Sequence, residues 1–249
     1  MQNLENKTEQ GGFPQYLTGR CVDHVTMGRK RTPRYKLAIF DFDGTLADSF
    51  TWFLSVINEV ADTYNFRRIK EQELVDLRSF DAKKMLEHVG IPMWKMPLLQ
   101  RYVRKRMTSD IGRIALFPGI AGLLQGLREE GIALAIVTSN SFINVREVLG
   151  RQNELLIQHY ACGAPILGKR AKLRKVLHTS GVHPSKAIFI GDEIRDLHAA
   201  RGEGIDFGAV SWGVNSAQSL TEHSPEEMFS SIDEIAEGII PSPVLQVFT

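Results

Sequence analysis

One stretch constrains the fold more than any other. The apolar run Leu37–Phe40 ends abruptly in two carboxylates, Asp41 and Asp43, followed by Gly44. Because the run does not alternate with polar residues, it predicts a strand buried on both faces, as in a parallel sheet, and Gly44 marks the turn out of it. Ligands of open α/β sheets bind beyond the carboxyl ends of the strands. Two acids placed there repel each other unless a cation is bound, and Mg²⁺ is the simplest candidate.

Two further apolar runs repeat this pattern. Residues 132–137 and 187–190 are uninterrupted, and polar residues follow them directly: Thr138, Ser139, Asn140 and Asp192. Weaker strand patterns lie near 160–164 and at 207–211, which we interpret as the final strand. Helical patterns separate these strands, so the fold class is predicted to be α/β, with βαβ units forming a doubly wound parallel sheet.

Residues 48–112 contain no strand pattern. Apolar residues recur there at helical spacing, and Asp48 or Ser49 is expected to cap the first helix. We interpret the segment as an inserted all-helical domain; ordinary helices of the core are the alternative. The expected helices lie near residues 50–64, 71–77, 81–89 and 94–107.

The domain organisation follows from these patterns. We expect the α/β core at residues 35–47 and 113–249, and the helical insert at 48–112. Residues 1–34 lack periodicity and include the basic run Gly28–Arg34. An arm that binds nucleic acid or a membrane surface is one reading of that run. A disordered extension is the favoured one, because termini are commonly disordered unless they dock.

Composition and charge argue against several classes of function and location. The chain has 249 residues, 43% of them hydrophobic, and a formal net charge of +1, so the charge balance demands neither nucleic acid nor an anionic membrane. No apolar run approaches the roughly 20 residues that span a bilayer, and the polar N-terminus is not expected to be a signal peptide. Two cysteines, Cys21 and Cys162, form no disulfide framework. We expect a cytoplasmic protein.

The stretch from Asp41 to Leu46, Asp-Phe-Asp-Gly-Thr-Leu, resembles motif I of the haloacid dehalogenase-like superfamily. The resemblance implies a Rossmann-like core with a small helical cap. It also implies that Asp41 is a nucleophile toward phosphorus and that Asp43 is the acid and base for the leaving oxygen and the attacking water. Carboxylates do serve as nucleophiles in enzymes that form aspartyl-phosphates.

The other three motifs occur in the same order as in the family. Thr138 resembles the motif II hydroxyl that binds a phosphoryl oxygen; Ser139 is the alternative, and Asn140 is expected to orient the loop. Lys169 resembles the motif III lysine, although Arg170 stands where the family usually has proline. Lys169 precedes Asp192 by 23 residues, close to the separation in related phosphatases, so it is preferred to Lys172.

Gly191-Asp192 together with Asp196 resembles motif IV. By resemblance, Mg²⁺ is held by the Asp41 carboxylate, the Asp43 backbone carbonyl and Asp192. Asp196 is expected to lie behind these ligands and to fix waters or the lysine. The helix dipole also stabilises a carboxylate near a helix N-terminus when no metal is bound. The alternative for Asp196 is therefore a structural role at the start of its helix.

The resemblance is closest to phosphoglycolate phosphatases and their relatives. It implies a Mg²⁺-dependent phosphomonoester hydrolase acting on a small phosphorylated metabolite, as a monomer or homodimer. A phosphosugar mutase of the β-phosphoglucomutase type and a non-catalytic binding protein are the alternatives. The residues expected to contact the substrate are Gly44, Thr45, Ser139, Asn140 and, from the cap, Arg78, whose alternative is an ordinary surface arginine.

Overall fold

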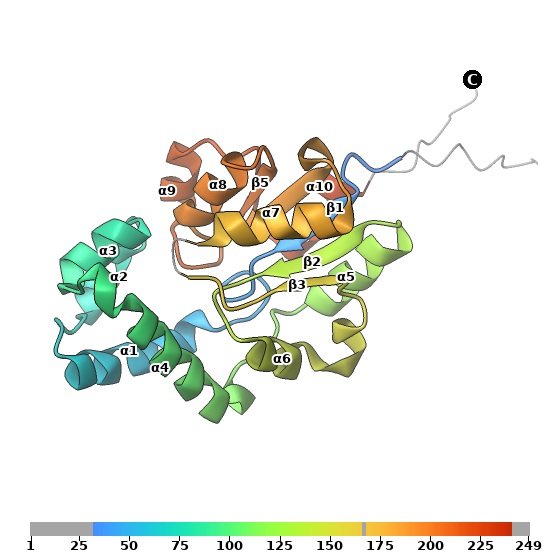
Figure 1. The fold of residues 1–249 in the computed structure, drawn as a ribbon. Helices are drawn as coiled ribbons and strands as arrows, with labels where there is room; N and C mark the ends of the chain where they lie inside the picture. Colours follow the sequence, from blue (N-terminus) through green and yellow to red (C-terminus); the bar gives the residue numbers. More distant parts are fainter. Residues whose placement is uncertain (1–31, 166–167, 241–249) are drawn as a thin grey trace, which may run out of the picture. The chain divides into compact units, whose positions relative to one another are not determined.

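A computed structural model describes residues 32–165 and 168–240, which form an α/β core with a helical insertion (Figure 1). Most of the predicted 1–34 extension, with Cys21, lies outside the described residues. The six strands are all parallel and lie in the order β3-β2-β1-β4-β5-β6. Their bounds are β1 Leu37–Phe40, β2 Ala133–Val137, β3 His159–Ala161, β4 Ala187–Gly191, β5 Asp206–Val210 and β6 Glu227–Phe229. The predicted α/β class and parallel sheet are confirmed.

Ten α-helices lie among the described residues. Four belong to the insertion, namely α1 Phe50–Tyr64, α2 Leu74–Leu77, α3 Ala82–Val89 and α4 Met96–Ser109. The other six are α5 Ile120–Glu129, α6 Phe142–Glu154, α7 Lys169–Ser180, α8 Ile194–Arg201, α9 Ala217–Glu222 and α10 Ile232–Ile239.

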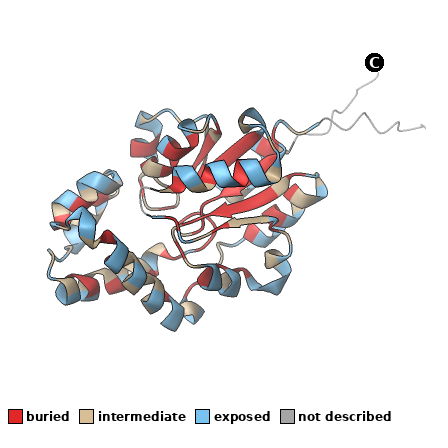
Figure 2. Ribbon diagram, viewed as in Figure 1, coloured by how far each residue is buried: buried red, intermediate tan, exposed pale blue. Residues whose placement is uncertain are grey.

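Side chains alternate between the two faces of the sheet and give each face its own apolar core. Ala38 and Phe40 of β1 pack with α5, α6 and α10, whereas Leu37 and Ile39 pack with α7, α8 and α9. All four residues are fully buried, as the strands in Figure 2 show by colour. Helices on both faces explain why the strands read as uninterrupted apolar runs.

The sequence prediction missed the end of the sheet. The apolar pattern predicts the final strand at residues 207–211, but a further strand, β6, pairs beside β5, with Gly208 opposite Glu227 and Val210 opposite Phe229. β6 has three residues and lies at the edge of the sheet. A strand this short carries too few positions for a periodic pattern to be recognised.

Between β1 and α5 the regular elements are all helices, apart from two isolated β-bridges where the segment leaves and rejoins the core. Its entry and exit lie side by side, because Asp48 N–H donates to the Ala115 carbonyl and Phe117 N–H donates to the Leu46 carbonyl, both at 2.9 Å. The helices enclose a small apolar cluster of their own, formed by Val60, Leu86, Met96 and Leu99. Ser49 precedes α1 without capping it through its side chain.

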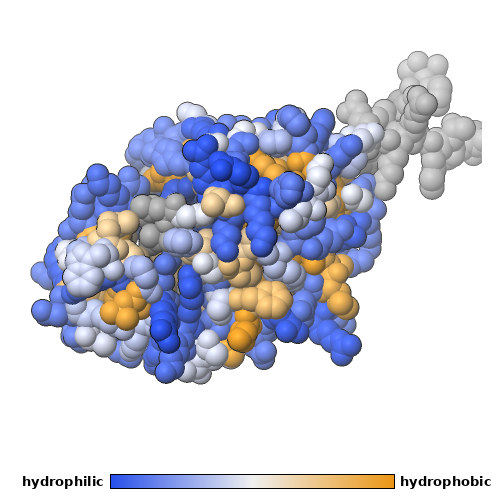
Figure 3. Space-filling view, viewed as in Figure 1, coloured by the Kyte–Doolittle hydropathy of each residue, from blue (hydrophilic) through white to orange (hydrophobic). Residues whose placement is uncertain are grey.

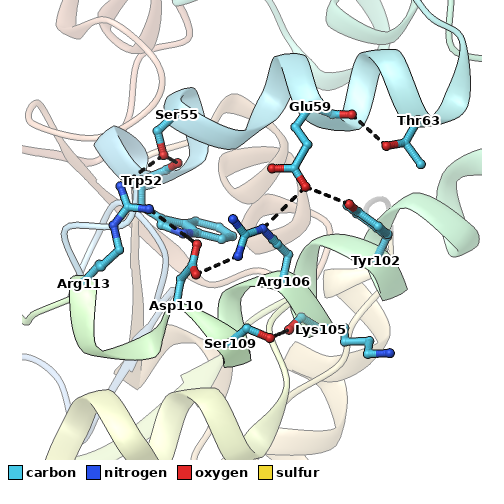
Figure 4. A network of polar contacts seen from close by, with 10 residues as sticks. All are labelled: Trp52, Ser55, Glu59, Thr63, Tyr102, Lys105, Arg106, Ser109, Asp110 and Arg113. Atoms are coloured by element: carbon cyan, nitrogen blue, oxygen red, sulfur yellow. Dashed lines mark hydrogen bonds and ion pairs between the residues drawn. The ribbon is translucent and has the colours of Figure 1, made fainter.

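A polar network ties α1 to the end of α4 at the base of the insertion (Figure 4). Asp110 accepts hydrogen bonds from Trp52 Nε1 at 3.0 Å and from Arg106 at 2.7 Å. Glu59 on α1 accepts from the Tyr102 hydroxyl at 3.0 Å. The hydrogen bond from Trp52 and the charge of Arg106 lower the pKa of Asp110, although partial burial opposes them.

The surface is mostly hydrophilic with scattered hydrophobic residues on the face drawn in Figure 3. Arg34, which falls in the predicted 1–34 extension, bonds to Asp206 at 2.9 Å and Glu227 at 3.0 Å. In the described part of the chain, no helix combines the length and the apolar character needed to cross a bilayer.

Candidate active site

The strand order brings the predicted motifs to one edge of the sheet. β1 lies between β2 and β4, and Phe40 is level with Ile136 and Ile190 in the register. The core helix that follows β1, α5, packs on one face of the sheet, whereas the helix that follows β4, α8, packs on the other. The strand order therefore reverses between β1 and β4, which makes this edge the crevice where such sheets bind ligands. Asp41, Thr138 and Asp192 each follow one of these three strands, so their Cα positions lie within about one residue of the same level along the sheet.

Lys169 is the cation of the site. Its Nζ lies 2.7 Å from Asp41 Oδ2 and 2.8 Å from Asp196 Oδ2, and the side chain is only 2% exposed. Burial alone would lower the pKa of Lys169, but the carboxylates of Asp196 and Asp41 outweigh it and raise the pKa above its ordinary value. Lys172 instead donates to the Cys162 carbonyl at 3.2 Å. The structure therefore brings Lys169, and not Lys172, to the carboxylates.

Three buried carboxylates form the candidate metal site. Oxygens of Asp41, Asp192 and Asp196 lie within 4.8 Å of one another. When all three are ionised they carry three negative charges, and Lys169 supplies one positive charge. The neighbouring Arg195 is paired with Glu193, so the ionised cluster is short of two positive charges. Asp196 Oδ1 is also buried without a hydrogen-bond partner. Hard oxygen donors, the charge deficit and the unpartnered oxygen all fit Mg²⁺.

Backbone packing and two hydrogen bonds hold Asp192 in place. Its carboxylate accepts from the Thr45 hydroxyl at 2.8 Å and from Val214 N–H at 2.7 Å. A Cβ on Gly44, whose φ is +78°, would lie 2.4 Å from Asp192 Oδ2, and one on Gly213 would lie 2.1 Å from Asp192 Cβ. Only glycine allows both backbones to approach this closely. Burial, with the charges of Glu193 and Asp41, raises the pKa of Asp192 to about 7.

Asp43 has a different environment from Asp41. It is half-buried, and it receives hydrogen bonds from Asn140 Nδ2 at 3.1 Å and from the Ser49 hydroxyl. Burial and the charge of Asp41 raise the pKa of Asp43 to about 6, against these hydrogen bonds. A carboxyl that titrates near neutrality is suited to giving and taking a proton.

The polar residues after β2 form a chain that continues into the insertion. Asn140 Oδ1 accepts from Asn144 Nδ2 at 2.9 Å, and Asn144 Nδ2 also donates to the Arg104 carbonyl of α4 at 3.1 Å. Asn144 Oδ1 accepts from the Thr108 hydroxyl at 2.7 Å. Asn140 and Asn144 are both buried. Through these bonds α4 is connected to Asp43.

The remaining predicted residues are placed as follows. Thr138 is fully buried, and its hydroxyl accepts from Asn140 N–H at 3.0 Å, which leaves the hydroxyl proton for an acceptor in the site. Ser139 and Gly44 line the cavity that contains Asp43. The Thr45 hydroxyl donates to Asp192, and its predicted contact with substrate stays a prediction.

Arg78 also lines this cavity, but its guanidinium is engaged with the core. It donates to the Gly213 carbonyl at 2.8 Å and to the Val214 carbonyl at 3.1 Å. Asn215 completes the contact from the other side by donating to the Arg78 and Phe80 carbonyls, both at 2.9 Å. The loop after α2 is thus joined to the loop after β5.

Sequence reasoning missed Asn144 and the segment from Gly213 to Asn215. A signal existed for each. Asn144 lies four residues before the apolar Val148 and so on the same side of the helix, which indicated burial. Gly213 follows the strand at 207–211, and strand ends meet at the same edge of a parallel sheet.

Comparisons with known proteins agree with this geometry. Residues 38–210 match the haloacid dehalogenase-like hydrolase family. The chain is 33% identical to a phosphoglycolate phosphatase of Synechococcus elongatus over 202 residues, covering 81% of this chain and 95% of the relative.

Two solved structures share the fold. A Lactobacillus plantarum protein has a TM-score of 0.70 at 24% identity and covers 82% of this chain and 99% of its own. CbbY from Rhodobacter sphaeroides, solved with phosphate, has a TM-score of 0.61 at 20% identity, covering 81% and 96%. The chain belongs to the haloacid dehalogenase-like hydrolase family and, within it, is similar to phosphatases.

Proposed function

We propose that the protein is a Mg²⁺-dependent phosphomonoester hydrolase that acts through an aspartyl-phosphate on Asp41. The observation that carries this is the buried contact of Asp41 with Lys169 at 2.7 Å, with Asp43 two residues away. Lys169 offsets the negative charge that would otherwise repel a phosphate from Asp41. Such positioning and charge stabilisation provide most of the catalysis in phosphoryl transfer.

The proposed roles balance the protons of both steps. A free oxygen of Asp41 attacks phosphorus, the bond from phosphorus to the alcohol oxygen breaks, and Asp43 gives its proton to that oxygen. In the second step Asp43 takes a proton from water, and the water oxygen attacks phosphorus. The bond from phosphorus to Asp41 breaks, and inorganic phosphate and free Asp41 result. One group acts as acid and then as base, so its pKa must lie near the working pH.

Asp41, Asp192 and the Asp43 carbonyl would hold Mg²⁺, and Asp196 would position Lys169 and the waters around the ion. The ion would neutralise phosphate oxygens. We further propose that Thr138 donates to a phosphoryl oxygen and that residues 48–112 form a cap that shields the site from water. Phosphoglycolate heads the list of metabolites to test, because the relative with 33% identity carries that name.

Hydrolysis of 4-nitrophenyl phosphate by the purified full chain tests the proposal. We expect turnover with Mg²⁺, loss of turnover with EDTA, and loss in Asp41→Asn. Asp48→Asn, an exposed carboxylate nearby, is the matched control and should retain activity. Turnover that survives Asp41→Asn would rule out the proposed nucleophile. Release of inorganic phosphate, without transfer to a second sugar hydroxyl, separates a hydrolase from a mutase.

A further inference from the structure

The cavity that contains Asp43 does not end at the catalytic residues. Its volume is about 310 Å³, and its lining runs from Asp43, Ser139 and Asn140 to residues of the helical insertion. Apolar side chains of all four inserted helices take part, among them Phe53, Leu54, Ile57, Leu77, Met85 and Val103. A single space therefore connects the catalytic carboxyl with the apolar interior of the insertion.

The charged residues that line this cavity already have partners. Arg78 donates to the Gly213 and Val214 carbonyls, and Arg104 donates to the Ala164 carbonyl at 3.2 Å. Arg195 is paired with Glu193. Beyond these guanidinium groups the lining is mostly apolar, so a substrate carboxylate that extended into that part of the cavity would be buried unpaired, and burying an unpaired charge is very unfavourable.

On these observations we infer that the substrate is a phosphomonoester of an apolar alcohol, whose hydrocarbon part occupies the space between α1, α3 and α4. This inference rests on the proposed function and specifies its substrate class. The phosphate would lie at the carboxylates, and the alcohol oxygen would lie beside Asp43. The carbon chain then extends past Ser139 and Leu54, where water is displaced from apolar surface.

A homologous series of primary alkyl phosphates tests the inference, because the bond that breaks is the same in each member. We expect kcat/KM, measured with Mg²⁺, to rise about fourfold per methylene from methyl to hexyl phosphate, the value for transferring one methylene out of water. Phosphoglycolate, which carries a second anionic group, should be a poorer substrate than ethyl phosphate.

Filling the cavity provides a second measurement. Leu54→Trp should lower kcat/KM for hexyl phosphate by at least about tenfold, the lower end of the discrimination that a hydrophobic pocket makes, and leave methyl phosphate nearly unchanged. Leu98→Trp is the matched control, because Leu98 is 51% exposed on α4 and does not line the cavity.

The possible results distinguish the inference about the substrate from the proposal that the protein is a hydrolase. A flat series, or phosphoglycolate as the best substrate, would overturn the apolar-alcohol inference and leave the hydrolase proposal standing. Equal losses for both esters in Leu54→Trp would also count against the inference. Failure to hydrolyse any ester with Mg²⁺ present would contradict the proposed function and, with it, the inference.

Discussion

The core and the insertion meet at Asp43, and they are built in different ways. On the core side, buried carboxylates are held by Lys169, by a hydroxyl and by backbone N–H groups, and Asp196 Oδ1 is the one buried side-chain oxygen or nitrogen of the described residues without a partner. On the insertion side, apolar side chains surround about 310 Å³ of space. We conclude that the chemical step depends on the fixed positions of the polar groups. Selectivity among substrates depends on the size and lining of the cavity in the insertion. Changes in the core other than at the acid Asp43 should affect all substrates equally, and changes in the insertion should alter their ranking.

The largest expected effect comes from Lys169→Met. It leaves Asp41 and Asp196 without their cation, so we expect kcat to fall roughly 10³–10⁵-fold for every ester, the range for losing a cation that stabilises a transferring phosphoryl group. Removing one partner of a buried ion pair should also lower the free energy of unfolding by about 3–5 kcal/mol. Steady-state kinetics and urea unfolding measure the two effects.

Lys172→Met is the matched control for this prediction. Lys172 lies on the same helix and donates to the Cys162 backbone carbonyl, away from the carboxylates, so the change should leave kcat within a few-fold of the wild type. Loss of activity for alkyl esters in Lys169→Met without loss for 4-nitrophenyl phosphate would contradict the conclusion that core changes act uniformly.

Asp43→Asn should have the next largest effect. We expect kcat to fall roughly 10²–10⁴-fold for alkyl phosphates, the range for general acid–base catalysis. 4-Nitrophenolate leaves without needing a proton, so the first step should persist with this ester while the second is slowed. Stopped-flow absorbance should therefore show a burst close to one equivalent of 4-nitrophenolate per enzyme. Linear release from the first turnover would argue against the two-step assignment.

Asn144→Ala probes the connection between the two regions. The change removes three hydrogen bonds in a buried position, so we expect the free energy of unfolding to fall by about 1–3 kcal/mol. Since Asn140 then loses its support, kcat should fall up to about tenfold with little change in substrate ranking. Asn153→Ala, on the same helix but partly exposed, is the control. A variant that is destabilised with unchanged kcat would show that Asn144 is structural only.

The smallest effect is expected at the base of the insertion, in Asp110→Asn. The pKa of Asp110 is lowered in the folded state, so its contribution to stability is complete above the unfolded value near 3.9 and is lost as the pH falls through the folded value. The variant should thus have a lower Tm than the wild type at pH 7 and at pH 5, and the difference should shrink below about pH 4. Asp76→Asn, an exposed carboxylate of the insertion, should show no such difference.

Much of the core was predictable because its signals are local. The runs before Asp41, Thr138 and Asp192 are uninterrupted, and buried parallel strands require this. The family, the fold class and the phosphatase class inferred from these motifs are confirmed. The roles of individual residues and the Mg²⁺ site remain predictions, as do the cytoplasmic location and the oligomeric state.

What could not be predicted depends on distant parts of the chain. β6 is recognisable only through its pairing with β5. The choice between Lys169 and Lys172 depends on how α7 is directed against the sheet, which spacing alone does not determine. The partners of Arg78 come from residues more than 130 positions later. Each of these features arises from tertiary packing, which local sequence patterns do not encode.

The segment Gly213–Val214 contacts both Asp192 of the core and Arg78 of the insertion, which links the positions of these two residues thermodynamically. Its Val214 N–H orients Asp192, while its two carbonyls hold Arg78 from the insertion. Binding equilibria that share one element are linked, and the linkage is reciprocal. A cation that orders Asp192 should therefore favour the docked position of the Arg78 loop, and undocking of that loop should weaken cation binding by the same factor.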